Sequence, residues 1–391
     1  MALSRRGFVH TVGLGATAAW IGARGREHSI WSAFEAPLQA VEPGMIVLSS
    51  NENPLGPGKA VMKAVRAAFG EGGRAPGRYS GASGDLIDAI AKRLGVKPEN
   101  IVLGCGSTQI LRTATHLFTA KDKPLVGTIP TYEECAGYAE MMGHPVRPVA
   151  LDGEFKIDLG KFSDAAKGSG LVFYCNPNNP TATYVGAKAT REFLAKIARE
   201  SPDTTVLVDE AYYDYVTDPD HDTHIPVALD NPRVVIARTF SKAYGMAGLR
   251  MGYAVAHADT IKKMREWDAG SGTSSLNVLA MHAALAAVEQ DPSFITAERA
   301  RNTASRDFTM KWFADRGMKP TASQANFMFV EIGRPAKEFR EACRKKGVLI
   351  ARDFPPFEKT HARLSFGTMD EMKKAVAVFG DVLGKRAATA A

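Results

Sequence analysis

The sequence RTFSKAYGMAGLRMGY, which runs from Arg238 to Tyr253, decides how the fold of this chain is interpreted. It follows the β-branched run Val234–Ile236, which predicts a buried strand. A lysine beside a bound phosphate can form an imine with an aldehyde cofactor that carries the phosphate. The alternative, a surface lysine in an ordinary strand-to-loop turn, is disfavoured by the motifs described below. Lys242 stands among two hydroxyls and a guanidinium that suit a phosphate dianion, on Thr239, Ser241 and Arg250.

The length and composition are those of an ordinary globular protein. The 391 residues, of which 45% are hydrophobic, are enough for two subdomains around a large core. The net charge is +7, but the longest cationic run, Arg344–Lys346, has no aromatic stripe beside it, so nucleic-acid binding is not expected. The four cysteines are widely spaced and predict neither a disulfide framework nor a metal site. Cys105 and Cys175 lie in strand-like runs and are predicted to be packing residues.

The first 23 residues differ in character from the rest of the chain. Arg5 and Arg6 precede an apolar stretch, Val9–Ile21, that is rich in small residues and too short for a comfortable membrane span. This arrangement resembles a twin-arginine export signal. We therefore expect residues 1–23 to be a signal peptide, the protein to be periplasmic or otherwise exported, and no stable membrane insertion. The alternative is a disordered basic N-terminus without a signal function, in which case the protein is cytoplasmic.

Strand-like and helix-like segments alternate from Ile101 onward. Strands rich in Val, Ile and Leu that are separated by helices predict an α/β fold, with a mostly parallel mixed sheet flanked by helices. Ligands of such sheets bind beyond the carboxyl ends of the strands. The predicted strands are 46–48, 101–103, 125–129, 146–150, 171–175, 205–208, 234–237 and 253–256, and the predicted helices are 59–69, 85–94, 108–118, 132–142 and 189–200.

Pro292 and a long helical pattern at 294–316 indicate a second, smaller α/β domain. Its predicted strands are 326–331, 348–350 and 363–366, with helices at 336–346 and 370–383. The predicted organisation is a signal peptide at 1–23, an N-terminal arm at 24–45, a segment joining the small domain at 46–75, a large domain at 76–288 and a small C-terminal domain at 289–391.

The glycine-rich segment Gly104–Gln109, GCGSTQ, follows a predicted strand and opens a predicted helix. Such a turn offers an anion free backbone N–H groups and the positive end of the helix dipole, and Ser107 and Thr108 add hydroxyls. Ser and Thr are also common at the start of any helix, so an ordinary helix cap is the alternative.

The segment Val206–Tyr212, VLVDEAY, ends a predicted strand with an acidic residue. A buried aspartate at position 209 favours the protonated form of a nearby ring nitrogen, which pyridoxal phosphate needs in order to act as an electron sink. Tyr212, three residues after Asp209, can donate to the phenolic oxygen of that ring. The alternative is the magnesium site of a nucleotidase, which requires a Walker A loop that this chain lacks.

The string NPNNPT, at Asn176–Thr181, is the most specific of these motifs. Two X-Pro bonds in six residues predict a rigid polar loop after a strand. In this loop Asn179 can hold the phenolic oxygen from the side opposite Tyr212. The string alone would be an ordinary turn, but it stands together with the three motifs above.

In their order and spacing, these motifs resemble the class I/II aminotransferases, which are pyridoxal 5'-phosphate (PLP) enzymes of fold type I. They resemble in particular the histidinol-phosphate aminotransferase-like branch. The resemblance runs from about Leu48 to about Met369. It rests on SNENPLGP, RY, GCGST, PTY at 130–132, NPNNPT, DEAY, TFSKAYGMAGLR and ARLSFGT at 362–368.

The resemblance implies three catalytic residues and a cofactor site. Lys242 would hold PLP as a Schiff base and carry a proton to and from the substrate. Asp209 would pair with the ring nitrogen, and Tyr212 together with Asn179 would hold the phenolic oxygen. Tyr132 would stack on the ring. The phosphate would bind to the residues of a cup formed by Gly106, Ser107, Thr108, Thr239, Ser241 and Arg250.

The resemblance also implies a substrate site and a homodimer. Arg363 would bind the α-carboxylate of the substrate as a bidentate pair, and Asn51 would be a second substrate-binding residue. Tyr79 would reach the cofactor of the neighbouring subunit, so the two subunits would share their active sites.

The implied reaction is transamination, in which an amino acid and a 2-oxo acid exchange an amino group through the Schiff base at Lys242. The alternative is a PLP-dependent decarboxylase, eliminase or cyclase that acts on a modified amino acid, because one fold supports many reactions. A PLP-binding regulator without activity is disfavoured, because the chain retains every residue that the chemistry needs.

Several positions depart from the family pattern, and they bear on the substrate rather than on the cofactor. Ala182 replaces the usual glycine, Ser80 the usual proline and Tyr215 a common phenylalanine, while Thr108–Gln109 lacks the usual acidic residue. Histidinol phosphate itself is not expected as the substrate, because histidine biosynthesis is cytoplasmic and this chain has the features of an exported protein.

Overall fold

Seven strands form one mixed sheet in the computed structural model, which describes residues 41–70, 77–78, 82–267 and 275–384. These residues belong to one compact unit that begins at Val41. Five neighbouring strands of the sheet run parallel to one another. The strand β8 (Gly252–Ala256), beside them, is antiparallel to both of its neighbours. The predicted α/β fold with a mostly parallel mixed sheet is therefore confirmed. The strand order is β2 (Ile101–Gly104), β8 (Gly252–Ala256), β7 (Val234–Thr239), β6 (Thr205–Asp209), β5 (Leu171–Cys175), β3 (Leu125–Ile129) and β4 (Val146–Ala150).

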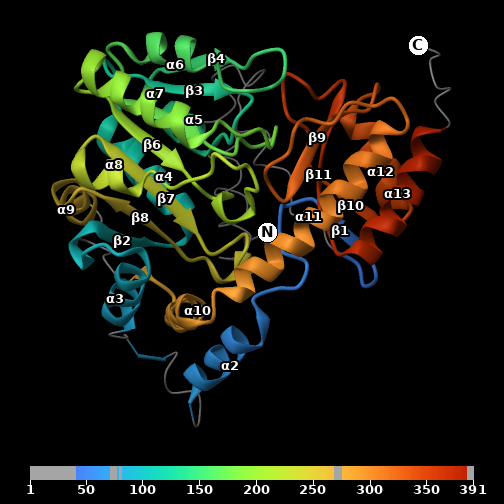
Figure 1. The fold of residues 1–391 in the computed structure, drawn as a ribbon, viewed down its shortest axis with the longest axis horizontal. Helices are drawn as coiled ribbons and strands as arrows, with labels where there is room; N and C mark the ends of the chain where they lie inside the picture. Colours follow the sequence, from blue (N-terminus) through green and yellow to red (C-terminus); the bar gives the residue numbers. More distant parts are fainter. Residues whose placement is uncertain (1–40, 71–76, 79–81, 268–274, 385–391) are drawn as a thin grey trace, which may run out of the picture. The chain divides into compact units, whose positions relative to one another are not determined.

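Both faces of the sheet are covered, because alternate residues of a strand pack into different apolar clusters. In β5, Val172 and Tyr174 belong to one cluster, and Leu171 and Phe173 belong to the other. Figure 1 shows the helices arranged around the sheet. The first cluster includes residues of α3 (Ala82–Leu94), α6 (Leu159–Ala166), α7 (Ala187–Glu200), α8 (Ile225–Asp230) and α10 (Val278–Glu289). The second includes residues of α4 (Gly106–Phe118), α5 (Glu134–Met141) and α9 (Ala258–Trp267).

The C-terminal part of the chain builds its own core around two short sheets (Figure 1). Strands β9 (Phe327–Glu331) and β11 (His361–Ser365) pair antiparallel. Strand β1 (Ile46–Leu48) pairs parallel with β10 (Val348–Ile350), so the first described strand joins the C-terminal ones. The helices of this part are α11 (Ser293–Ala314), α12 (Ala336–Lys345) and α13 (Met369–Leu383). The domain boundaries at 24–45, 46–75, 76–288 and 289–391 stay predictions.

Four of the described helices were not expected from the sequence, in one case because the apolar residues follow no helical period. That case is α10, VLAMHAALAAVE, which is apolar on most of its circumference and packs against both α2 (Gly58–Phe69) and α3. A helix that is buried all round shows no amphipathic stripe. The other three are α6, α8 and α9. Three short 3-10 helices complete the described elements, at Pro98–Asn100, Tyr213–Tyr215 and Ala247–Leu249.

The described helices give no indication of a membrane span, because none of them combines the required length with sufficient apolar character. The predicted signal peptide, residues 24–40 of the arm and Tyr79 lie outside the described residues.

Candidate active site

The parallel strands β5, β6 and β7 end at the same edge of the sheet, and each leads directly into one of the predicted motifs. In the register of these strands, Cys175 pairs with Asp209, and Asp209 pairs with Ala237. The NPNNPT loop therefore starts beside Asp209, and Lys242 follows the end of the neighbouring strand. This is the edge at which ligands of parallel sheets bind.

The side chain of Lys242 is partly buried at this edge. Its Nζ donates a hydrogen bond to the carbonyl oxygen of Ser50 at 3.1 Å and lies 5.8 Å from the centre of the Tyr212 ring. Burial, followed by the positive charge of Arg363, lowers the pKa of Lys242 to about 8. A substantial fraction of its amine is therefore neutral near physiological pH, as a nucleophilic lysine requires.

Asp209 is a buried carboxylate at the end of β6. Its Oδ1 accepts a hydrogen bond from the Ala211 N–H at 3.1 Å, while the donor near its Oδ2 is the weak thiol of Cys175, at 4.0 Å. Burial raises the pKa of Asp209 to about 7, against the opposing effects of the Ala211 N–H and the Lys242 charge. A cationic N–H donor at Oδ2 would stabilise the ionised form of this carboxylate.

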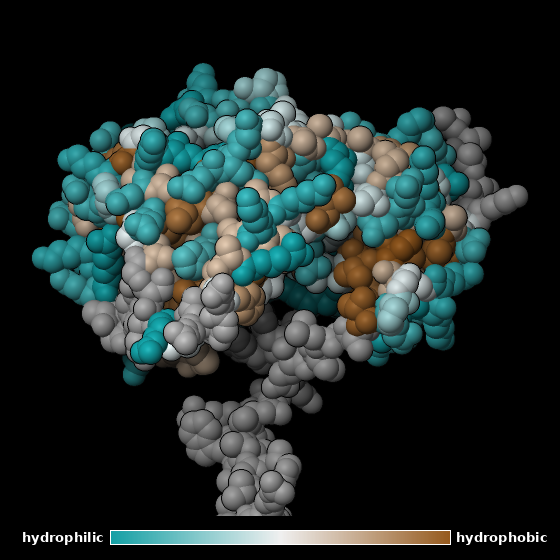
Figure 2. All heavy atoms as spheres, turned by 90° about the horizontal axis from the view of Figure 1, so that it is seen from below, coloured by the Kyte–Doolittle hydropathy of each residue, from teal (hydrophilic) through white to brown (hydrophobic). Residues whose placement is uncertain are grey.

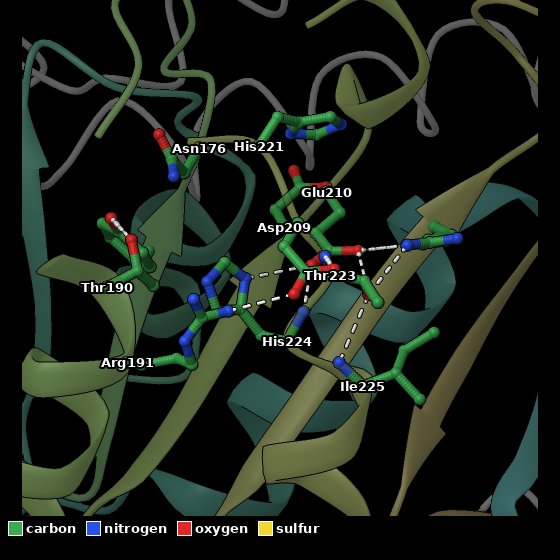
Figure 3. Close-up of polar contacts among 12 residues, drawn as sticks. Asn176, Thr190, Arg191, Asp209, Glu210, His221, Thr223, His224 and Ile225 are labelled. Carbon is green, nitrogen blue, oxygen red and sulfur yellow. Dashed lines mark hydrogen bonds and ion pairs between the residues drawn. The ribbon is translucent and has the colours of Figure 1, made fainter. Parts of the chain in front are cut away.

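A second buried acid, Glu210, follows Asp209 and is bonded to an arginine and a histidine (Figure 3). Glu210 Oε2 accepts from Arg238 at 2.7 and 2.9 Å, and Oε1 lies 3.2 Å from Nδ1 of His224. Burial alone would raise the pKa of Glu210, but Arg238 and His224 outweigh it and lower the pKa to about 2. Glu210 therefore stays ionised, and its bonds tie the end of β6 to β7 and to the start of α8.

Arg363, on β11, is held by the NPNNPT loop and by the segment that follows β1. Arg363 donates to Oδ1 of Asn179 at 2.8 Å and to the carbonyl oxygen of Ser49 at 2.6 Å, and its Nε has no partner among the described residues. Because Arg363 uses the amide oxygen of Asn179, the amide nitrogen is the donor that Asn179 can offer a ligand. Burial lowers the pKa of Arg363 to about 10, which leaves it cationic at neutral pH.

Asn51 links Tyr212 to the C-terminal strands. Its Nδ2 donates to the Tyr212 hydroxyl at 3.1 Å, and its Oδ1 accepts from the Ser365 hydroxyl at 2.8 Å. Its backbone N–H also donates to Ser365, and its φ of 55° is left-handed, a conformation that Asn tolerates better than most residues. The sequence motifs contained Ser365, but only the folded chain shows that it positions Asn51.

The predicted phosphate residues gather at the start of α4. Arg250 adopts a left-handed φ of 58° and directs its guanidinium to the Ser241 hydroxyl, at 3.4 Å, and to the Ala247 carbonyl, at 2.8 Å. A Cβ at Gly106 would collide with this guanidinium, so the helix start and the arginine can lie together only because residue 106 is glycine. The Thr239 hydroxyl accepts from the Ser241 N–H at 3.1 Å. Ser107 and Thr108 occupy the first turn of the helix.

Tyr132 is joined to this group through a side-chain hydrogen bond with Thr108, and burial raises its pKa. The described chain therefore brings together all the predicted site residues except Tyr79, which lies outside the described residues. The prediction that Cys105 is a packing residue is wrong. Cys105 is exposed, because the chain leaves β2 one residue earlier and Cys105 precedes the first residue of α4.

Sequence reasoning missed two charged residues near this site, Glu133 and Arg352. Arg352 Nη2 donates to Glu133 Oε2 at 2.6 Å, although 219 positions separate the two residues. Glu133 directly follows the PTY motif, which is a cue that the sequence did offer. Nothing in the sequence around Arg352 indicates its partner.

Comparisons with known proteins agree on one family. A sequence model described as aminotransferase class I and II matches residues 43–379. A histidinol-phosphate aminotransferase of Moorella thermoacetica is 34% identical over 344 residues, which cover 87% of this chain and 86% of that protein. One from Halalkalibacterium halodurans is 31% identical over 346 residues, covering 88% and 91%. The crystal structure of histidinol-phosphate aminotransferase from Sinorhizobium meliloti in complex with pyridoxal-5'-phosphate is similar with a TM-score of 0.76 and 27% identity, covering 86% and 90%.

The lowered pKa of Lys242 predicts an unusual pH profile for its chemical modification. Because burial disfavours the ammonium form, labelling by limiting acetic anhydride should rise about fivefold from pH 7 to pH 8 and less than about twofold from pH 8 to pH 9. Free Nα-acetyl-lysine, the reference, should keep rising about tenfold per pH unit over this range. Mass spectrometry of the Lys242 peptide from cofactor-free protein measures the labelling. A tenfold rise per unit up to pH 9 would contradict the lowered pKa.

Proposed function

The chain belongs to the class I and II aminotransferase family, and we propose that the cluster around Lys242 is the site at which it transfers an amino group. The protein is a PLP-dependent aminotransferase, which exchanges an amino group between an amino acid and a 2-oxo acid. One observation carries the assignment of the site. Lys242 is a lysine of lowered pKa whose Nζ lies 5.8 Å from the centre of the Tyr212 ring and is influenced by the charges of the buried Arg363 and Asp209.

The residues at the sheet edge fit the chemistry of PLP. The hydroxyls and guanidinium at the start of α4 suit its phosphate, and the Gly106 position leaves the room that this arrangement needs. Oδ2 of Asp209 has a weak donor and can accept a hydrogen bond from a protonated ring nitrogen. When bound, PLP supplies an electron sink for the negative charge that develops at the substrate Cα. The residues that we assign to the phosphate are Gly106, Ser107, Thr108, Thr239, Ser241 and Arg250.

We assign the proton transfer to Nζ of Lys242. A general base works best when its pKa lies near the working pH, and burial together with Arg363 brings the pKa of Lys242 to about 8. The same nitrogen can therefore accept a proton from the substrate Cα and return one later. The hydrogen bond to the Ser50 carbonyl holds the amine in place at 3.1 Å.

The substrate carboxylate is assigned to Arg363. Asn179 and the Ser49 carbonyl already fix the orientation of its guanidinium, so little side-chain entropy remains to be lost on binding. Asn51 is assigned to the same end of the site, because it bonds to Tyr212 and is held by Ser365. Tyr212 and the amide nitrogen of Asn179 are assigned to the phenolic oxygen of PLP, and Tyr132 to its ring.

Replacing Lys242 with alanine should reduce amino transfer by about 10²-fold or more, because the general base is lost. The PLP-loaded protein is mixed with a panel of amino acids, and the change of its absorption band is followed before and after a 2-oxo acid is added. Lys374→Ala, on the exposed face of α13, is the control and should behave as the unchanged protein. Borohydride should fix a pyridoxyl group on Lys242 of the unchanged protein.

Two results would contradict this function. Full turnover by the Lys242→Ala protein would remove Lys242 from the reaction. Release of carbon dioxide or ammonia without any amino transfer would instead favour the decarboxylase, eliminase or cyclase alternative.

We propose that residues 1–23 export the protein through the twin-arginine route and place it in the periplasm. The support is the Arg5–Arg6 pair before a short apolar stretch. Replacing both arginines with lysine should retain the protein in the cytoplasm, because the export receptor reads the arginine pair rather than the charge alone. Fractionation and immunoblotting measure the distribution. The matched control replaces Arg24 and Arg26, which lie beyond the predicted signal. An unchanged distribution in the first variant would make the export proposal wrong.

We propose that the protein is a homodimer, with Tyr79 of each chain reaching the cofactor of the other. Large apolar side chains on the described surface support this proposal, among them Leu55 and Phe69 in the segment at 46–75. Figure 2 shows several separate apolar areas on the face seen from below, the largest of them at the right of the view. Light scattering of the purified protein should give a mass of about two chains. A mass of one chain at micromolar concentration would contradict the proposal.

A further inference from the structure

A second guanidinium lies close to the one that we assign to the substrate carboxylate. The guanidinium carbon of Arg363 lies 4.7 Å from the centre of the Phe354 ring, and that of Arg352 lies 4.5 Å from the centre of the same ring. Phe354 is itself buried. Arg352 therefore belongs to the surroundings of the group that we assign to the substrate carboxylate. Alone, it would make this part of the site attractive to a second negative charge on the substrate.

Arg352 is not alone, because Glu133 neutralises it. Its Nη2 donates to Glu133 Oε2 at 2.6 Å, and its Nη1 donates to the Asp353 carbonyl at 2.9 Å. The Glu133 side chain is 17% exposed and that of Arg352 is 32% exposed, so this pair is partly shielded from water. The neighbouring acid, Glu134, forms its ion pair with Arg112, so Glu133 is the acid that pairs with Arg352.

To pair with Nη2 of Arg352, an acidic group on the substrate side chain would have to displace Glu133. The displaced carboxylate would then be partly buried without its partner and would repel the incoming group, and both effects weaken binding. A substrate with an uncharged side chain avoids both costs, because the ion pair between Glu133 and Arg352 stays intact. Glu133 also follows Tyr132 directly, the residue assigned to the cofactor ring.

We infer that Glu133 is a specificity determinant, which closes Arg352 to substrates and so selects amino acids with an uncharged side chain over those with a carboxylate or phosphate at its end. This inference rests on the proposed function, since it takes Arg363 as the receptor of the α-carboxylate. It concerns the substrate side chain alone.

Glutamine and glutamate test the inference, because they have nearly the same shape and differ in charge. With the PLP-loaded protein, kcat/KM should favour glutamine. In Glu133→Gln, kcat/KM for glutamate divided by kcat/KM for glutamine should rise about tenfold or more, because Arg352 becomes available to the glutamate side chain. Adding Arg352→Gln to this variant should reverse the gain. Asp381→Asn, which removes the same charge from an exposed ion pair with Lys346, should leave the ratio unchanged.

Binding of two inhibitors gives a readout that does not depend on turnover. Calorimetry measures the affinities for succinate and butyrate, which differ in one carboxylate. The affinity for succinate relative to that for butyrate should be about tenfold higher in Glu133→Gln than in the unchanged protein. Glu133→Ser provides a second variant if Glu133→Gln does not fold. Unchanged ratios in folded variants would overturn the inference. If no amino acid donates its amino group, the proposed function fails, and the calorimetric ratio still decides the role of Glu133.

Discussion

The parallel register of β5, β6 and β7 is the constraint on which the rest of the site depends. Because the three strands run in one direction, their carboxyl ends meet, and the NPNNPT loop, Asp209 and the approach to Lys242 are brought to one edge. The strands are buried on both faces, so a shift in register by one residue would turn apolar side chains into the wrong cluster. The packing of the core thus fixes the relative positions of the functional groups.

Burial at this edge disfavours the charged form of each ionisable side chain, so it shifts the pKa of a lysine and that of an aspartate in opposite directions. It lowers the pKa of Lys242 to about 8 and raises that of Asp209 to about 7, whereas Glu210, one residue further on, is kept ionised by Arg238 and His224. A buried acid with strong partners serves the structure. One with a weak donor, such as Asp209, keeps the capacity to interact with a cationic ligand.

Segments that are far apart in the chain complete the site. Asn51 and Ser365 are 314 positions apart, as are Ser49 and Arg363, and each pair is joined by hydrogen bonds. The pairing of β1 with β10 places the segment after β1 in the C-terminal part of the chain, which also contains β11. The C-terminal strands therefore hold the groups assigned to the substrate, while the large sheet holds those assigned to the cofactor. The two groups are in direct contact, because Arg363 donates to Asn179 and Asn51 donates to Tyr212.

The sequence by itself determined the fold class, nearly all strand positions and the motifs of the cofactor site. Strands are short β-branched runs bounded by Gly, Pro or polar residues, and the reactive groups follow them directly, so this information is local. Periodicity could not reveal α10, which is apolar on most of its circumference, and the strand-like run before Cys105 wrongly suggested a buried side chain. Only the tertiary structure decided that Arg363 is oriented by Asn179 and that Glu133 neutralises Arg352. These contacts join residues that are 184 and 219 positions apart, and they arise from packing that no local pattern encodes.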